Sequence, residues 1–351
     1  RETPPPDCIP STGNPACSAS IEVSIYPAVK TFSGDTVAGM GFAKSDGTCA
    51  AAGSSSIKAY IASSTAGSGS QLGAFAPGGI SGFLSSVKQS NAAPKPNGLT
   101  FGGTPVSGGL ALNQTMGGGY NVTGCMENYF QTKQFNVDTN KTSVIGNDFN
   151  INRAEAGKQY IKNGDLTING GDLSGKNVSV FVDGDVFLSG NITIPSSGFN
   201  PANPPVFRLY VKGNIYVSKD VTELNGVFVA QPKDDGNKGE IYTCASGLGT
   251  SVSYGPDWST YVSQCQNQLK VYGSFTAKKV ILNRIKSNGT VDGVVNLPSV
   301  PISENYNSTA ASDVFIWVPY LYLPSANTSE HPTTGPSSDD YKFIGTLPPI
   351  L

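Results

Sequence analysis

Acidic side chains in the middle of the chain are the first candidates for chemistry. Asp165, Asp183 and Asp185 each adjoin a glycine, and clustered carboxylates on an open face are what polysaccharide hydrolases and lyases use. All three fall where the chain is expected to turn, and Asp is favoured in turns because its side chain bonds the nearby backbone. We therefore assign no catalytic residue and expect no enzyme activity.

A turn rich in oxygen atoms is the next candidate. Asp234, Asp235, Asn237 and Glu240 offer the carboxylate and carbonyl oxygens that Ca²⁺ prefers. Their spacing is not that of an EF-hand loop, and Lys238 among them would repel a cation. We interpret this stretch as a plain turn, with Ca²⁺ as the alternative, and expect no other cofactor.

The composition excludes several further classes of function. The 351-residue chain has one histidine, His331, so neither a histidine-based triad nor a zinc site is expected. Charged residues are 14% and the net charge is −2, whereas nucleic-acid binding requires concentrated basic charge. No apolar run reaches the roughly 18 residues of a membrane-spanning helix, so we expect no transmembrane segment in this sequence.

Six cysteines indicate the compartment. Six cysteines can form three disulfides in fifteen ways. In one of these, each cysteine pairs with its neighbour in sequence order: Cys8 with Cys17, Cys49 with Cys125, and Cys244 with Cys265. Disulfides are typical of oxidising surroundings, and unpaired buried thiols are the alternative. We therefore expect an extracellular, cell-surface protein, exported with a leader or upstream segment that this sequence does not include.

Asn-x-Ser/Thr sequons are candidate glycosylation sites, although a chain rich in Ser and Thr produces several by chance. The candidates are Asn113, Asn121, Asn140, Asn177, Asn191, Asn288, Asn307 and Asn327. Two of them, Asn177 and Asn191, lie beside expected strands, where a glycan requires an outward side chain.

A short pattern recurs between about residues 155 and 285: a glycine, a small polar residue, then an alternating triplet. The copies are Gly164–Ile168, Gly184–Leu188, Gly213–Val217 and Asn225–Val229, with Gly273–Ala277 as a weaker copy. Short strands at a spacing near 20 residues favour a parallel β-solenoid, in which each repeat forms one coil and Gly with Asp or Asn turns the corner through positive φ. An antiparallel sandwich is the alternative.

The alternating triplets predict two inward columns and one outward column. The inward columns are Leu166, Val186, Ile215 and Val227, and Ile168, Leu188, Val217 and Val229. The outward column is Thr167, Phe187, Tyr216 and Phe228. Aromatic side chains on an outer face need cover, either from the rest of this chain or from a partner.

Aromatic residues therefore supply the interface candidates. They are Phe187, Tyr216 and Phe228 of the outward column, and Tyr254, Trp258 and Tyr261 of the loop that a Cys244–Cys265 disulfide would close. The loop is interpreted as a recognition loop or as an excursion packed on the flank of the solenoid.

The chain as a whole is expected to be all-β. Residues 1–20 form an extended Pro-rich arm, and 21–150 form a β-sandwich-like domain. Residues 151–295 form the solenoid, with the disulfide-closed loop 244–265, and 296–351 form an extended tail that packs on it. Two β-sandwich domains are the alternative.

Two resemblances accompany these motifs. The coils Gly184–Leu188 and Gly213–Val217 resemble bactofilin-type, polymer-forming β-solenoids over roughly residues 155–285. Other segments are similar to large exported surface proteins of candidate-phyla (Patescibacteria-like) bacteria: Gly226–Gln231, Ile241–Cys244, Gln268–Phe275, Asp313–Phe315, Pro319–Leu323 and Leu347–Leu351. The resemblance to the surface proteins implies no activity that carries over to this chain. The cysteines, the extra N-terminal domain and the exported character depart from bactofilins, so cytoskeletal polymerisation is not implied.

These observations together predict a non-enzymatic structural protein. We expect a subunit of a cell-surface filament, pilus-like fibre or surface coat that forms a homopolymer through β contacts, in which the arm 1–20 can pair with a neighbour's sheet edge. A cell-surface adhesin that binds a glycan or a host-cell protein is the second hypothesis. A polysaccharide-active β-helix enzyme is the third.

Overall fold

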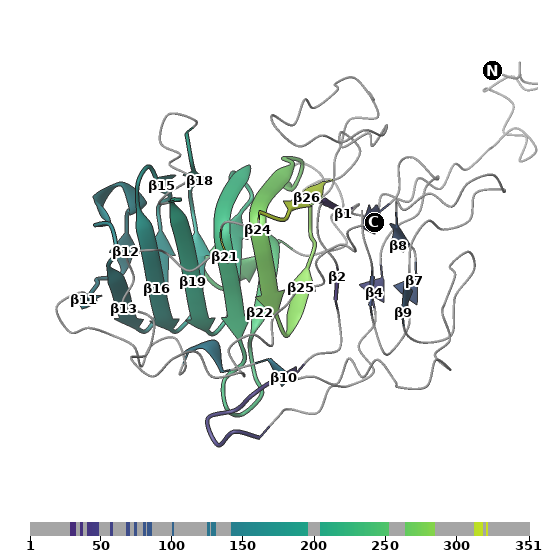
Figure 1. Cartoon of the computed structure of the whole chain (residues 1–351), viewed down its shortest axis with the longest axis horizontal. Coiled ribbons are helices and arrows are strands. Elements are labelled where there is room, and N and C mark those ends of the chain that lie inside the picture. Colours follow the sequence, from purple (N-terminus) through teal and green to yellow (C-terminus); the bar gives the residue numbers. More distant parts are fainter. Residues whose placement is uncertain are drawn as a thin grey trace, which may run out of the picture.

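The protein is built from parallel β-sheets (Figure 1). The computed structural model describes residues 29–32, 36–37, 41–48, 57–58, 68–70, 74–75, 80–81, 83–85, 100–101, 125–126, 128–130, 142–195, 204–252, 264–284, 312–318 and 321. Two large sheets, which we call sheet 1 and sheet 2, contain most of these strands.

Sheet 1 has twelve strands. Its path runs through β11 (Thr142–Val144), β13 (Gln159–Asn163), β16 (Asn177–Asp183), β19 (Val206–Lys212), β21 (Glu223–Gln231), β24 (Leu269–Ala277), β26 (Asp313–Ile316), β1 (Val29–Phe32), β5 (Ser68–Ser70) and β8 (Phe83–Ser85), with β15 (Gly171–Asp172) and β18 (Ile192–Thr193) beside it.

Sheet 2 has seven strands. They are β12 (Asp148–Phe149), β14 (Leu166–Ile168), β17 (Val186–Leu188), β20 (Ile215–Ser218), β22 (Glu240–Gly247), β23 (Thr250–Ser251) and β25 (Lys279–Ile281). A 3₁₀ turn, η3 (Ile151–Arg153), follows β12. Three smaller sheets are β2 (Thr36–Val37) with β6 (Ala74–Phe75) and β9 (Thr100–Phe101), β3 (Gly41–Phe42) with β10 (Cys125–Met126), and β4 (Ile57–Lys58) with β7 (Ile80–Ser81).

From β11 onward the chain passes back and forth between the two large sheets, and each pass places a strand beside its predecessor in parallel. Among the described strands only β22 and β23 pair antiparallel. This alternation is consistent with a β-solenoid-like arrangement, and we call each passage through sheet 1 and sheet 2 a coil.

The sandwich that we expected in 21–150 does not match the described strands of that range. There β1 pairs with β5, β5 with β8, β4 with β7, and β2 with β6, all in parallel. The strands β1, β5 and β8 extend sheet 1 itself. Short apolar stretches in that range could not reveal their partners, because parallel pairing joins residues far apart in sequence.

The inward columns are confirmed for their first three members. Leu166, Val186 and Ile215 stand in register in sheet 2 and are at most 1% exposed. The fourth member was wrong, because Ile241 of β22 pairs with Ile215. Val227, predicted for that place, lies instead in sheet 1.

The second inward column has the same outcome. Ile168, Leu188 and Val217 are confirmed in sheet 2, whereas Val229 lies in sheet 1. The Asn225–Val229 copy is therefore a strand of the other sheet. Phe228 was predicted to point outward but is fully buried, and its ring lies 5.9 Å from that of Phe207 and 5.5 Å from that of Phe275. Phe228 is thus a core residue and no interface residue.

The corner glycines are required for a reason other than the one expected. Gly164 has φ +90°, as predicted, but Gly184 and Gly213 do not have positive φ. A Cβ on Gly184 would lie 2.4 Å from the carbonyl carbon of Gly164, and the corner therefore needs glycine because successive coils approach backbone to backbone.

The strand order in sheet 1 does not follow the sequence at its far end. After β24 comes β26, and beyond β26 lie β1, β5 and β8 from the N-terminal part (Figure 1). The strands of residues 142–284 therefore start at the β11 end of sheet 1. The strands β1, β5 and β8 of the N-terminal part lie at the opposite end. The structure describes residues 312–318 and 321 of the expected tail 296–351. Among these residues, β26 is a strand of sheet 1.

Candidate functional site

Two of the three acids considered for catalysis, Asp165 and Asp185, stabilise the corners between coils, whereas Asp183 Oδ1 lies 4.0 Å from Lys233 Nζ. Asp165 Oδ1 accepts the backbone N–H of Asp185 at 2.8 Å, 20 residues later. Asp185 Oδ1 accepts the N–H of Asn214 at 2.9 Å, and Asn214 Oδ1 accepts the N–H of Glu240 at 3.0 Å. We call these four residues the corner ladder; the side chains of Asp165, Asp185 and Asn214 each satisfy a backbone donor of the next coil.

Charged and aromatic groups surround the corner ladder. Lys238 Nζ lies 2.9 Å from Asp185 Oδ2, and this hydrogen bond raises the pKa of Lys238. The hydroxyl of Tyr242 donates to Glu240, and burial together with this bond raises the pKa of Tyr242. Asp185 and Glu240 of the corner ladder therefore each have a side-chain partner in addition to the backbone bonds of the ladder.

The proposed Ca²⁺ ligands are not brought together. Asp234 Oδ2 lies 3.0 Å from Lys212 Nζ, which lowers the pKa of Asp234. Asp235 accepts the backbone N–H of Asn237 at 2.9 Å within the turn, and Glu240 accepts from the tyrosine described above. Since each carboxylate has a separate partner, the geometry is that of a turn, and no cluster of metal-ligating groups occurs among the described residues.

The outward column of sheet 2 holds the remaining described interface candidates. Thr167, Phe187 and Tyr216 stand in register as predicted, and the fourth place belongs to Tyr242. The rings of Tyr216 and Tyr242 stack with centroids 5.0 Å apart and planes within 5° of parallel. Tyr216 is only 7% exposed, while Phe187 is half-buried. The candidates Tyr254, Trp258 and Tyr261 lie outside the described residues.

The outer face of sheet 1 carries an aromatic column that the sequence analysis missed. Phe181 and Tyr210 stand in register on adjacent strands, with ring centroids 5.0 Å apart. Phe42 of β3 packs in the same cluster, and Tyr129 stacks on Tyr210 at 6.1 Å. The N-terminal part therefore covers this face, which is the cover within the chain that exposed aromatics require. The alternation in Val178–Val182 and Phe207–Val211 was the available signal.

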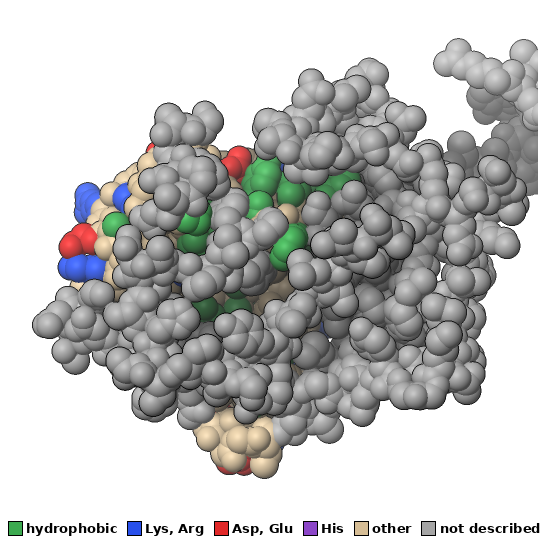
Figure 2. Space-filling model, in the orientation of Figure 1, with side chains coloured by type: hydrophobic (Ala, Val, Ile, Leu, Met, Phe, Trp, Pro, Cys, Tyr) green, Lys and Arg blue, Asp and Glu red, His purple; other side chains and the backbone are tan. Residues whose placement is uncertain are grey.

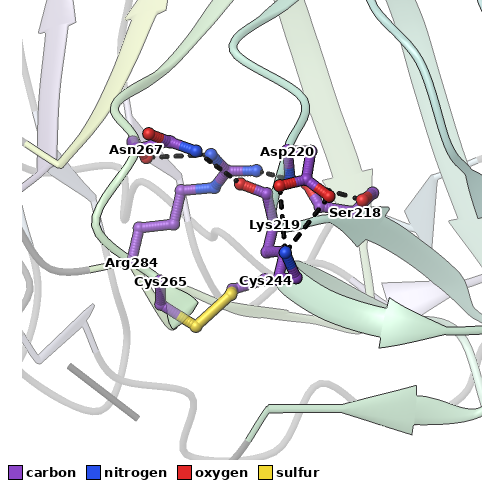
Figure 3. A network of polar contacts seen from close by, with 7 residues as sticks. All are labelled: Ser218, Lys219, Asp220, Cys244, Cys265, Asn267 and Arg284. Atoms are coloured by element: carbon purple, nitrogen blue, oxygen red, sulfur yellow. Dashed lines mark hydrogen bonds and ion pairs between the residues drawn. A yellow bond between two sulfur atoms is a disulfide. The ribbon is translucent and has the colours of Figure 1, made fainter. Parts of the chain in front are cut away.

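A buried arginine organises the end of the coil stack near the disulfide (Figure 3). Arg284 is fully buried, and its side chain donates to three carbonyl oxygens: Nε to Thr243 at 2.6 Å, Nη1 to Asn267 at 2.8 Å and Nη2 to Ser218 at 2.7 Å. Burial lowers the pKa of Arg284 to about 10. The guanidinium thus ties together three chain segments whose carbonyls face the interior.

The Cys244–Cys265 disulfide is confirmed beside this arginine, with a Cα–Cα distance of 5.9 Å (Figure 3). It closes a loop of sequence separation 21, a constraint that contributes about 3 kcal/mol in the chain-entropy model. Of the other candidates, Cys125 is described only by its backbone in β10, and Cys8, Cys17 and Cys49 lie outside the described residues.

A buried carboxyl lies on the strand that joins the N-terminal strands to the coils. Asp313 of β26 is fully buried, in register with Leu269 on one side and Val29 on the other. Its Oδ2 accepts from Ser312 Oγ at 3.3 Å, whereas its Oδ1 has no hydrogen-bond partner. Burial raises its pKa to about 7, although the positive charge of Arg284 opposes the shift. No sequence signal marked either residue, because their partners lie on distant segments.

The first coil presents an open edge. β11 is the first strand of sheet 1 and pairs with β13 alone among the described strands. Val144 in β11 is 85% exposed, the largest exposure among the apolar side chains described. Figure 2 shows charged side chains gathered at this end of the molecule, on the left of the view. The edge therefore combines a strand with one partner among the described strands, one exposed valine and nearby charged side chains.

Two sequons fall on described residues, and the carboxamide groups of both asparagines form hydrogen bonds within the fold. Asn177 Oδ1 accepts from Arg208 at 2.9 Å. Asn191 Oδ1 accepts the N–H of Thr222 at 2.8 Å, and its Nδ2, the atom to which a glycan attaches, donates to Thr222 Oγ1 at 3.1 Å. The other six candidates, Asn113, Asn121, Asn140, Asn288, Asn307 and Asn327, lie outside the described residues.

Comparison with family models, with curated proteins and with solved structures finds no match to this chain. Among the described residues, no helix is long and apolar enough to cross a membrane.

Proposed function

We propose that this chain is a non-enzymatic structural protein of the bacterial cell surface, a parallel β-solenoid that assembles into filaments by edge-to-edge stacking. The observation that carries the proposal is the sheet 1 path, which is parallel throughout and has two different ends, β11 and β8. An edge contact between copies then joins unlike surfaces, and a head-to-tail contact of this kind propagates into an open fibre.

The backbone of β11 supports the stacking. The N–H of Ile145 donates to the carbonyl of Ile161 on the β13 side, at 3.1 Å. Neighbouring amides in a strand point to opposite sides, so the N–H of Val144 points to the open side. A parallel strand from a second copy would find there the same hydrogen-bonding pattern that joins one coil to the next.

The remaining chemistry of the chain agrees with this role. The carboxylates of the corner ladder satisfy backbone donors between coils, and the disulfide with Arg284 fastens the end of the stack. These devices support a durable rod. Export, the surface location and homopolymer formation are parts of this proposal.

Electron microscopy of the purified chain tests the proposal. Wild-type protein is expected to form fibres or sheets, and Val144→Pro is expected to abolish them because proline removes the open-side N–H. Val144→Thr keeps that N–H and is the matched control, which should assemble. A wild-type protein that stays monomeric at high concentration, or a Val144→Pro variant that assembles normally while folded, would contradict the proposal.

The arm 1–20 lies outside the described residues, and we propose it as a second contact that adds a strand to a neighbour. Deletion of residues 1–20 should shorten or abolish the fibres if the arm takes part. Fibres of unchanged length and stability would leave the stacking edge as the sole contact.

A glycan-binding adhesin is the second candidate. A pocket of about 340 Å³ beside the first coils is lined by polar groups that include Asn147, Lys162, Asn163 and Asp165, together with Leu248. Polar groups beside an apolar wall suit a sugar ring. Binding to a glycan panel that is lost in Asn163→Ala would support this function, and binding that persists in the variant would place the site elsewhere.

A further inference from the structure

One strand, β26, joins two parts of sheet 1 that are far apart in the sequence. It pairs with β24 along Leu269–Tyr272 and with β1 along Val29–Phe32. Figure 1 shows β26 as the yellow strand between the green β24 and the purple β1. The edges of β24 and β1 thus form a slot that is one strand wide, and the C-terminal part of the chain fills it.

The slot receives alternate side chains on its two faces. On the interior face, Phe315 meets Phe275 with ring centroids 5.1 Å apart. On the opposite face, Val314 and Ile316 are buried with Phe32 of β1 in a small separate cluster. Main-chain pairing with pockets for alternate side chains is the recognition mode of an added strand.

Both ends of β26 are also bonded to the walls of the slot. The carbonyl of Ser312 accepts the N–H of Leu269 at 2.9 Å, and the N–H of Trp317 donates to the carbonyl of Phe32 at 2.9 Å. Six consecutive residues, 312–317, therefore make the strand pairing, the side-chain packing and the two end hydrogen bonds.

Two features make this strand separable from its own chain. First, residues 285–311, a stretch of 27, separate Arg284 from Ser312, and at full extension they span about 90 Å. Second, Asp313 brings a fully buried carboxyl whose Oδ1 has no hydrogen-bond partner, and an unsatisfied buried oxygen costs free energy when the strand docks. Within 142–252 the connections between consecutive strands are shorter, and the longest of them, 194–205, has 12 residues.

We propose that β26 is exchanged between copies, so that residues 312–317 of one chain fill the slot between β24 and β1 of another. The partner is a second copy of this chain, because the slot is shaped for this side-chain sequence. The inference rests on the proposed function only in requiring self-association, and it uses a surface distinct from the Val144 edge.

Isotope-coded crosslinking tests the exchange. Lys30 and Val314 face each other in register, so a variant with Lys30→Cys and Val314→Cys places two thiols across the junction. Separate ¹⁴N and ¹⁵N preparations of this variant are mixed in equal amounts at high concentration, incubated, oxidised mildly and digested. Mass spectrometry then shows whether the peptides joined by the new disulfide carry the same isotope.

Exchange predicts linked peptides of mixed isotope, up to about half of the total when the two preparations have fully equilibrated. The control variant, Gln159→Cys with Ser179→Cys, joins registered residues of consecutive coils and should give matched isotopes alone. Matched isotopes alone at the β1–β26 junction would overturn the proposal, and so would the absence of any crosslink there.

Failure of this inference is distinguishable from failure of the proposed function. Fibres that contain matched isotopes alone would leave the filament proposal standing and remove the exchange. Mixed isotopes in a preparation without fibres would support the exchange and contradict edge stacking.

Discussion

A Cβ atom placed on Gly213 would lie 2.0 Å from the carbonyl oxygen of Gly184 in the preceding coil. The same contact recurs one coil earlier, where a Cβ on Gly184 would lie 2.5 Å from the carbonyl oxygen of Gly164. The distance between coils at this corner is therefore set by backbone contact alone, and the corner ladder adds its hydrogen bonds directly beside it.

Gly213→Ala should consequently destabilise the protein strongly. The two nearest atoms belong to the backbone of Gly184 and cannot turn aside, so we expect a loss of about 3 kcal/mol or more in the free energy of unfolding, at the upper end for overpacking. Urea denaturation measures it. Gly247→Ala is the matched control, because a Cβ there meets no atom within 4 Å and its φ is not positive. Equal stability of the two variants would refute the backbone-contact explanation.

The inward column predicts a contrast between two registered residues of sheet 2. Ile241 is fully buried, whereas its partner Val280 in β25 is 36% exposed. Ile241→Ala should lower the free energy of unfolding by about 2–4 kcal/mol, since it leaves a cavity, and Val280→Ala should change it by about 0.5 kcal/mol or less. Thermal or urea unfolding compares them. A tolerant Ile241→Ala would mean that the column is misassigned.

Arg284→Lys should be far from conservative. The ammonium group of lysine cannot reach the three carbonyls of Thr243, Asn267 and Ser218 together, so buried acceptors lose their donors. We expect a loss of about 3 kcal/mol. The exposed Arg153 provides the matched control Arg153→Lys, which should unfold at the wild-type denaturant concentration. A wild-type-like Arg284→Lys would show that water replaces the missing donors.

The buried carboxyl of Asp313 should make stability fall as pH rises. Its pKa is raised from 3.8 to about 7 in the folded protein, so between these values the folded state keeps a proton that the unfolded chain releases. The free energy of unfolding therefore falls from about pH 4 to about pH 7 and then levels off, by at most roughly 4 kcal/mol. The charged group facing it is Arg284, which in turn faces Asp220.

Urea denaturation across that pH range measures this effect. Asp313→Asn should remove the fall and be more stable than wild type near pH 8. Asp235→Asn is the control, because the pKa of Asp235 is lowered by its bonds with Asn237 and the side chain is exposed, so the fall should persist. A profile of Asp313→Asn that parallels wild type would assign the pH dependence to other groups.

The sequence allowed part of this fold to be predicted because periodicity is a local signal. The triplets at Leu166, Val186 and Ile215 alternate within three residues and recur at similar spacing, which is enough to place them in one stacked column. The fourth copy failed because Val227 and Ile241 sit in similar local patterns, and only the pairing partner decides which sheet each one joins. Phe228 was misplaced for the same reason.

The features of the candidate surfaces were also predictable only where their signal was local in the sequence. The disulfide between Cys244 and Cys265 was predictable because the two cysteines are neighbours in sequence order. The burial of Arg284 and Asp313 was not, because each depends on segments many residues away. The exposure of Val144 likewise depends on which strand comes first in the sheet.

The sequence by itself determined the β character, the repeat and the inward side chains of the first three copies. The tertiary structure alone decided that the N-terminal strands extend sheet 1 in parallel and that β26 lies between them and the coils. The physical reason is that hydrophobic alternation fixes which face of a strand is buried, while the strand's neighbours are chosen by backbone pairing over distances that no local pattern encodes.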